Sequence, residues 1–146
     1  MPTALAADPV AVANRLRPVL FKLNRALRRE LHSLGVTGGQ VSLLIKVQKE
    51  PGIGIRELAR WERMSTPGMS KYVARLESAG LVCRRELEDR RRVGLELTPE
   101  GSRVLSSVKR RRTAWLAERL RGLSPGELDA VDAAVDPLLK LLEVGP

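Results

Sequence analysis

Apolar residues recur every three or four positions over the first part of the chain, from Val12 to Leu34. This spacing places them on one side of a helix. Asp8 followed by Pro9 is typical of an N-cap and first turn, and Gly35 is typical of a helix end. The pattern therefore predicts a long amphipathic helix over residues 8–34. Pro18 lies inside it, and we expect that residue to kink the helix or to split it in two.

Three shorter helical patterns follow. Thr37 and Gln40 have the spacing of a capping box at the start of the first, which Pro51-Gly52 ends. The second covers residues 55–63. The third covers residues 66–79, with Ser65-Thr66-Pro67 as its cap and Gly80 as its end.

The apolar period changes from helical to two after Gly80. Residues 81–84 suit a strand, and Val93, Leu95 and Leu97 alternate with polar or small residues. The polar, charged residues 86–91 lie between the two segments. This pattern predicts a β-hairpin, with Cys83 as a packed residue of its first strand.

Two more helices are predicted after the hairpin. Thr98-Pro99 begins one, and the capping box from Ser124 to Glu127 begins the other. The last helix carries an apolar stripe at Leu128, Val131, Val135, Leu138 or Leu139, and Leu142. The expected fold class is thus mostly α with a small β-hairpin.

The order of these elements is that of a winged helix-turn-helix, with the hairpin as the wing. We expect a single domain over residues 1–146, in which residues 37–98 form the winged lobe. The apolar stripes of the flanking helices, residues 8–34 and 99–143, have no evident partner within that lobe. Pairing with a second copy would bury them, so we expect these to be dimerisation helices and the protein to be a homodimer.

The helix over 66–79 has two unlike faces. Met69, Tyr72, Val73 and Leu76 form its inward face. The opposite face is small and polar, as a helix lying in the major groove of DNA requires; its members are Thr66, Pro67, Ser70, Lys71, Ala74, Arg75 and Ser78. An ordinary amphipathic surface helix is the alternative.

Charge favours a polyanionic partner. The 146 residues include 26 Lys and Arg against 17 Asp and Glu, a formal net charge of +9. Such a surplus suits nucleic acid or an anionic membrane surface. Arg90, Arg91 and Arg92 fall at the hairpin tip, from which a guanidinium can reach the strongly negative minor groove. A solvated charged loop is the alternative for this run.

Residues 55–101 resemble the DNA-binding lobe of the MarR family of bacterial regulators. Three segments carry the resemblance: Glu57-Leu58-Ala59, the helix exit from Leu76 to Val82, and Leu97-Thr98-Pro99-Glu100-Gly101. Asp89-Arg90-Arg91 stands where the family has Asp-x-Arg at the wing tip. The flanking helices extend the resemblance to nearly the whole chain.

The resemblance implies roles for individual residues. Major-groove and phosphate contacts fall to the recognition helix: Ser65, Thr66, Pro67, Gly68, Ser70, Lys71 and Arg75. The wing would make the minor-groove contacts, and Asp89 would hold one of its arginines by an ion pair. Whether Arg90, Arg91 or Arg92 enters the minor groove is open. It also implies a small aromatic or anionic effector, for which the candidate pocket residues are Phe21, Arg25, Lys46 and Trp115. Plain core packing is the alternative for Phe21 and Trp115.

Other classes of protein fit less well. The sequence offers no nucleophile–base pair, metal cluster or phosphate loop, so we expect no enzyme and no cofactor. His32, the only histidine, lacks neighbouring ligands for a metal. One cysteine, no secretory signal and no membrane-length apolar segment indicate a soluble cytoplasmic protein without membrane contact.

The expected function is that of a sequence-specific regulator of transcription that binds an inverted repeat in double-stranded DNA, and a repressor by analogy with the family. The alternative is a winged-helix protein that binds RNA or has an architectural role on nucleic acid. Single-stranded RNA readers need aromatic stacking platforms, and the four Trp, Tyr and Phe residues argue against that alternative.

Overall fold

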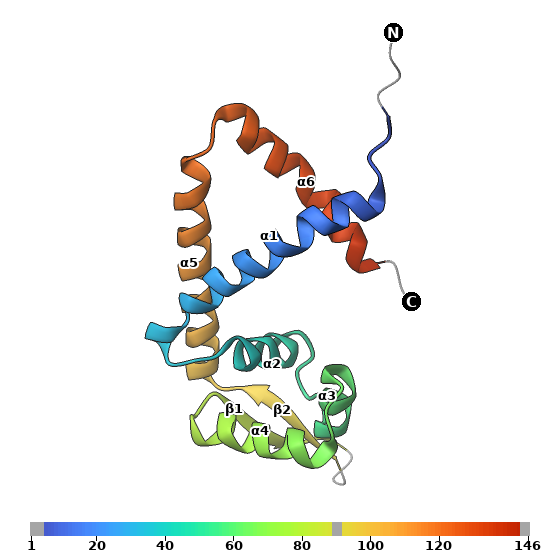
Figure 1. Cartoon of the computed structure of the whole chain (residues 1–146). Helices are drawn as coiled ribbons and strands as arrows, with labels where there is room; N and C mark the ends of the chain where they lie inside the picture. Colours follow the sequence, from blue (N-terminus) through green and yellow to red (C-terminus); the bar gives the residue numbers. More distant parts are fainter. Residues whose placement is uncertain (1–4, 89–91, 144–146) are drawn as a thin grey trace. The chain divides into compact units, whose positions relative to one another are not determined.

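The computed structural model describes residues 5–88 and 92–143. The chain forms two compact units, Met1–Arg111 and Arg112–Pro146. The expected mostly helical fold with a two-stranded antiparallel hairpin is confirmed (Figure 1). Among the described residues, no helix has a stretch long and apolar enough to cross a lipid bilayer.

The first helix, α1, spans Pro9–Arg29 and is shorter than predicted. Asp8 caps it by accepting a hydrogen bond from the Ala11 N–H at 3.0 Å, as expected. The helix continues through Pro18, so of the two expected effects of that residue the split is wrong. It ends at Arg29 because the chain turns there to bury Leu31 completely in the core. A short 3₁₀ turn, His32–Leu34, follows, and Gly35 adopts the left-handed conformation that the predicted end required.

Helices α2 (Gly38–Lys49), α3 (Ile55–Glu62) and α4 (Thr66–Ser78) lie where the sequence predicts them. The capping box of α2 is present in both directions. The Thr37 hydroxyl accepts from the Gln40 N–H at 3.1 Å, and the Gln40 side chain accepts from the Thr37 N–H at 2.9 Å. Local hydrogen bonding thus fixes the start of α2, as the spacing of these two residues predicts.

The hairpin pairs β1 (Val82–Glu86) with β2 (Val93–Leu97), with Glu86 opposite Val93. The predicted alternation holds only in part, because Val93 is exposed whereas Gly94 and Leu95 are buried. A short third segment explains this: the Gly52 N–H donates to the Leu95 carbonyl at 2.8 Å, and the Leu95 N–H donates to the Ile53 carbonyl at 2.9 Å. These bonds hold the backbone of Gly94 against the loop before α3. Cys83 is exposed, so its expected packing is wrong; β1 buries only Val82.

The core of the first unit is aliphatic, as the low aromatic content requires. It lies among α2, α3, α4 and the hairpin, and the inner side of α5 (Pro99–Arg121) contributes Leu105 and Val108. Fully buried large side chains come from each helix of the lobe: Leu43, Leu44, Leu58, Met69 and Leu76. The lobe therefore folds around one contiguous core, and this core fixes the position of α4.

The second unit holds the end of α5 and helix α6 (Pro125–Glu143). The predicted capping box is present, since the Glu127 N–H donates to the Ser124 hydroxyl at 3.2 Å and the Glu127 carboxylate accepts from the Ser124 N–H at 3.0 Å. The backbone N–H of Ser124, with a further contribution from the Ser124 side chain, stabilises the carboxylate and lowers the pKa of Glu127. The predicted apolar stripe of α6 is exposed in the single chain: Leu128, Val131, Val135, Leu138, Leu139 and Leu142.

Candidate nucleic-acid interface

The start of α4 is built as the sequence predicts. Ser65 is its N-cap, and the Ser65 hydroxyl accepts a hydrogen bond from the Gly68 N–H at 3.1 Å. Pro67 lies in the first turn of the helix, where a backbone N–H has no partner within the helix, so the N–H that proline lacks is not missed. A Cβ atom on Gly68 would lie 2.9 Å from the Ser65 hydroxyl oxygen, so glycine keeps this turn open for the cap. The cap presents Thr66 and Pro67 to solvent at the tip of the lobe.

The two predicted faces of α4 are confirmed. Met69, Val73 and Leu76 are buried, and Tyr72 packs against their edge. The residues of the opposite face are exposed, apart from the half-buried Ser70; they include Thr66, Pro67, Lys71, Ala74, Arg75 and Ser78. The helix therefore offers small hydroxyl groups and two cations on its free side. Such a surface can contact base edges and phosphates.

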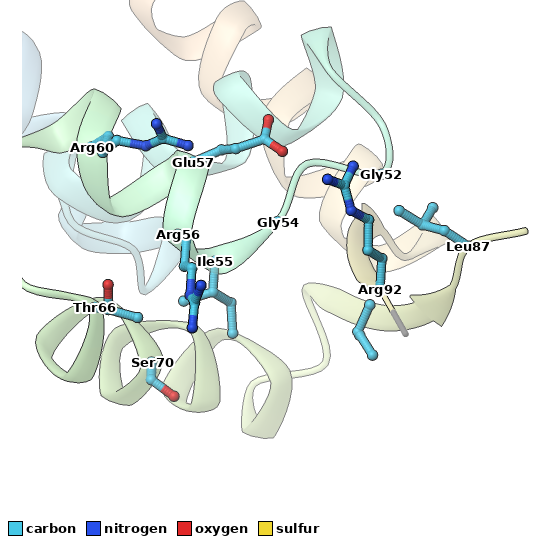
Figure 2. A pocket seen from close by; sticks show the side chains of 11 residues that line it. Gly52, Gly54, Ile55, Arg56, Glu57, Arg60, Thr66, Ser70, Leu87 and Arg92 are labelled. Atoms are coloured by element: carbon cyan, nitrogen blue, oxygen red, sulfur yellow. The ribbon is translucent and has the colours of Figure 1, made fainter. Parts of the chain in front are cut away.

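A hollow of about 650 Å³ lies beside this face, between α4, the start of α3 and the wing (Figure 2). Thr66 and Ser70 reach it from α4, and Arg56 and Arg60 reach it from α3. In Figure 2 the side chain of Arg56 lies between α3 and Ser70. The other lining residues are Gly52, Gly54, Ile55, Glu57, Leu87, Arg92 and Val93. The hollow thus forms one concave surface between α4 and the hairpin.

The charges on this surface are largely uncompensated. Among the described residues, no carboxylate pairs with Arg56, Arg60, Lys71, Arg75 or Arg92. Glu57 is the acidic residue that lines the hollow, against three arginines. A concave surface with this excess of cations attracts a polyanion. Binding of a nucleic acid to such a surface releases the counterions that surround its phosphates.

Arg56 and Arg60 are the site residues that the sequence reasoning missed. They lie four positions apart on α3, away from the buried Leu58 and Ala59, and both are exposed. This spacing puts two guanidinium groups on one side of a two-turn helix. The spacing is visible in the sequence, but nothing local distinguishes it from an ordinary solvated pair of arginines.

The predicted wing residues are only partly covered by the structure. Asp89, Arg90 and Arg91, with the expected ion pair of Asp89, lie outside the described residues. Arg92 is described; its carbonyl accepts from the Leu87 N–H at 3.0 Å, which closes the loop next to the last strand pair. Its exposed side chain extends toward Gly52 in Figure 2.

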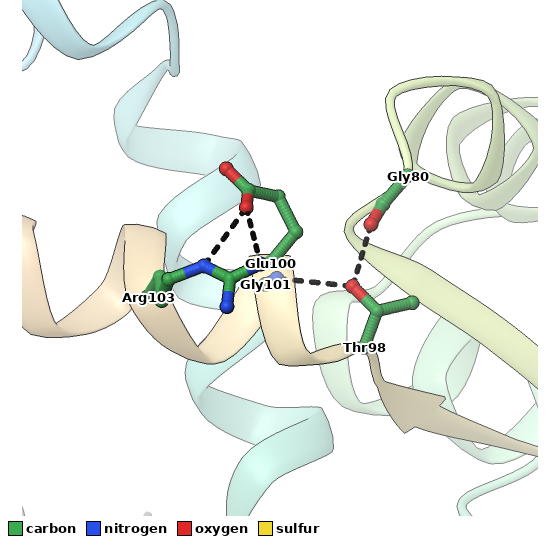
Figure 3. A network of polar contacts seen from close by, with 5 residues as sticks. All are labelled: Gly80, Thr98, Glu100, Gly101 and Arg103. Atoms are coloured by element: carbon green, nitrogen blue, oxygen red, sulfur yellow. Dashed lines mark hydrogen bonds and ion pairs between the residues drawn. The ribbon is translucent and has the colours of Figure 1, made fainter.

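Two polar contacts hold α4 against the hairpin. The Thr98 hydroxyl donates to the Gly80 carbonyl at 2.5 Å and accepts from the Gly101 N–H at 3.0 Å (Figure 3). The Arg84 guanidinium on β1 donates to the Glu77 carboxylate on α4 at 2.7 Å. These hydrogen bonds link the end of α4, the hairpin and the start of α5 at one corner of the lobe.

The four residues predicted for an effector pocket belong to both units. Phe21 and Arg25 line one hollow of about 440 Å³ on α1, together with Asn24, Arg28, Arg29 and His32. Lys46 lines a separate hollow between α2 and α3. Trp115 belongs to the second unit, where the Arg119 guanidinium lies 5.2 Å from its ring centroid. The effector assignment of all four residues therefore stays a prediction.

Comparisons with known proteins find matches to the winged lobe and to most of the chain. The family model for MarR matches residues 36–93, which is the lobe that carries the hollow. An HTH-type transcriptional regulator of Mycobacterium tuberculosis is 32% identical over 92% of this chain and 95% of its own. The HTH-type transcriptional repressor MdtR of Bacillus subtilis is 26% identical over 77% of this chain and 74% of its own.

Solved structures share the fold. A MarR family protein from Bacillus stearothermophilus aligns with a TM-score of 0.79 at 24% identity, over 95% of this chain and all of that one. The protein RV1404 from Mycobacterium tuberculosis aligns with a TM-score of 0.82 at 19% identity, over 95% and 97% of the two chains. The match therefore extends beyond the winged lobe to the flanking helices.

Proposed function

The chain belongs to the MarR family of HTH-type transcriptional regulators, and we propose that it binds an inverted repeat in double-stranded DNA as a homodimer and represses transcription. As a member of this family it is a regulator and not an enzyme. The observation that carries the proposal is the concave basic surface shared by α3, α4 and Arg92. Repression is supported by the relative MdtR, which is named a repressor.

The polar face of α4 would enter the major groove, with Ser70 and Lys71 at the base edges. Arg56 and Arg60 lie on the neighbouring helix, where they would contact the phosphates that border the groove. The wing, with Arg92 at the loop end of its second strand, would reach the adjacent minor groove. This arrangement favours duplex DNA over single-stranded RNA, because the described part of the face presents no aromatic stacking platform.

The homodimer is supported by the two helices outside the lobe. On α1 the exposed apolar residues include Val12, Leu20, Phe21 and Leu23, and on α6 the whole apolar stripe is exposed. α1 carries six basic and no acidic residues, whereas α6 carries five acidic residues and one lysine. Apolar stripes with opposite charges are suited to burial against a second copy. A two-fold dimer would read a two-fold DNA site.

An effector is part of the same proposal. A small aromatic anion would meet Phe21, Arg25 and the two further arginines of the hollow on α1. Binding of this anion would lower the affinity of the protein for DNA if the anion favoured a conformation of the dimer in which the two lobes do not fit the two half-sites.

The direct test is selection of binding sites from a random duplex library with the full chain at two salt concentrations. We expect an inverted repeat with half-sites about 10 base pairs apart, and log affinity that falls steeply with log salt. RNA of matched length serves as the competitor. Equal or tighter binding of RNA, or selection without any sequence preference, would overturn the proposal.

A further inference from the structure

The turn between α3 and α4 contains an arginine in a strained backbone conformation. Arg63 has φ 56° and ψ 43°, which is the left-handed region. Among the described residues, every other residue with a positive φ is a glycine: Gly35, Gly52 and Gly80. An L side chain is strained in this region, because its Cβ atom crowds the following carbonyl oxygen. Arginine thus occupies a position where glycine would be more stable.

Local hydrogen bonds hold Arg63 in this conformation. The Met64 N–H donates to the Ala59 carbonyl at 2.9 Å, and the Arg63 N–H donates to the Arg60 carbonyl at 3.2 Å. These are the two bonds of a Schellman motif, which ends a helix on a left-handed residue that is usually glycine. The motif explains the backbone, but it gives no reason for an arginine side chain.

The side chain of Arg63 does not offset the strain through contacts within the described part of the chain. Arg63 is exposed, and it belongs neither to the core nor to the residues that pack against the core. No carboxylate of the described residues pairs with its guanidinium. Strained residues of this kind cluster at functional sites, so the conformation of Arg63 points to a function of its side chain.

Arg63 lies where the chain enters the recognition helix. It comes two residues before Ser65, the N-cap of α4, and three residues after Arg60, which lines the basic hollow. In a helix-turn-helix the first helix crosses the DNA backbone, and the N-terminal residues of the second helix lie in the major groove. The turn that joins the two helices therefore passes the phosphates at the edge of that groove.

We propose that Arg63 is a further DNA-binding residue, whose guanidinium contacts a phosphate at the edge of the major groove. The proposal rests on the proposed function and extends it to a residue outside the recognition helix, the wing and the hollow. A guanidinium is always charged and donates two parallel hydrogen bonds to a phosphate. A contact to the DNA backbone raises the affinity for all sequences and carries no base preference.

The test measures stability and DNA affinity on the same variants of the full chain. Arg63→Gly removes both the strain and the charge, so the two properties should change in opposite directions. We expect a higher urea midpoint at fixed protein concentration and roughly tenfold weaker binding to the selected inverted repeat. The slope of log affinity against log salt should decrease by about one unit for each lost phosphate contact, hence by about two units for a dimer.

Two further variants separate the charge from the strain. Arg63→Gln removes the charge but keeps a Cβ atom in the strained conformation, so it should weaken DNA binding as Arg63→Gly does and leave the urea midpoint unchanged. Arg121→Gln makes the same charge change on α5 and should alter neither property. Gly35→Arg is the control for strain, because Gly35 has φ 71° and a Cβ atom there meets nothing within 4 Å. Its urea midpoint should fall.

The possible outcomes distinguish the role of Arg63 from the proposed function. If the unmodified protein binds the inverted repeat and both Arg63 variants bind it with the same affinity and salt slope, Arg63 makes no phosphate contact and the proposed function stands. A changed base preference in these variants would also refute a contact to phosphate. A urea midpoint that does not rise in Arg63→Gly would show that the side chain stabilises the end of α3 instead. If the unmodified protein does not bind duplex DNA, both proposals are wrong.

Discussion

The backbone of Gly94 on the wing lies directly against Gly52 in the loop before α3. A Cβ atom on Gly94 would lie 2.4 Å from the Gly52 carbonyl oxygen and 2.7 Å from the Gly52 Cα. The clash is with backbone, which cannot swing away as a side chain can. This contact allows the Gly52 N–H and the Ile53 carbonyl to hydrogen-bond with the backbone of Leu95, and so it anchors the wing to the helical lobe.

Gly94→Ala should therefore destabilise the lobe. Overpacking of this kind costs about 1–3 kcal/mol, and we expect the urea midpoint to fall by the corresponding amount at fixed protein concentration. Gly126→Ala is the matched control, because a Cβ atom there meets nothing within 4 Å and alanine favours a helix. Equal midpoints for the two variants would contradict the close approach of Gly94 and Gly52.

Thr98 should act through its hydroxyl group and not through its shape. Thr98→Val keeps the volume but removes the bond to the Gly80 carbonyl and the cap on the Gly101 N–H. A buried or half-buried polar group left without its partner costs about 1–3 kcal/mol. We expect Thr98→Val to lower the free energy of unfolding, measured in urea, by about that amount. Thr98→Ser keeps the hydroxyl group and should retain most of the stability of the unmodified protein. A valine variant as stable as the serine variant would show that the corner does not depend on this hydroxyl.

The apolar stripe of α6 should control the oligomeric state. Val131→Glu with Val135→Glu places two charges in the stripe, where burial against a second copy would be costly. Size exclusion with light scattering should give twice the 16.1 kDa chain mass for the unmodified protein and a smaller mass or aggregates for the double variant. Ala133→Glu, on the other side of the helix, is the control and should remain dimeric. A monomeric unmodified protein at micromolar concentration would refute the dimer.

Local rules predicted most of the fold. Capping boxes at Thr37 and Ser124, the Ser65 cap and the change of period after Gly80 each depend on neighbours within a few residues. The errors arose where distant parts decide the outcome. The first helix ends before Leu31 because that side chain is buried in the core of the lobe. Val93 is exposed because the next residue, Gly94, packs against the loop at Gly52.

The candidate site could be predicted only in part for the same reason. The two faces of α4 follow from helical periodicity, and the structure confirms them. The hollow needs the packing of α3 beside α4 and the wing, which no local pattern specifies. Arg56 and Arg60 acquire significance only through that packing. The wing tip at residues 89–91 remains a sequence prediction.

The last prediction separates contacts to bases from contacts to phosphates on the proposed DNA-binding face. Lys71 lies on the exposed side of α4, whereas Arg56 lies on α3 and Arg92 at the loop end of the wing. Lys71→Ala should relax the base preference at one position of each half-site, at a cost of roughly 1–3 kcal/mol. Arg56→Gln and Arg92→Gln should weaken binding to all sequences and reduce the slope of log affinity against log salt by about one unit for each phosphate that the variant no longer neutralises.

Site selection from a random duplex library and fluorescence anisotropy at several salt concentrations distinguish the two effects. Arg121→Gln is the control, because it makes the same charge change on an arginine far along the sequence from the lobe and paired with Glu118. Arg90→Ala with Arg91→Ala belongs in the same series, since a neighbouring arginine can mask a single substitution at the wing. If Arg56→Gln and Arg92→Gln keep the salt slope of the unmodified protein while Lys71→Ala keeps its base preference, these residues do not form the DNA-binding face.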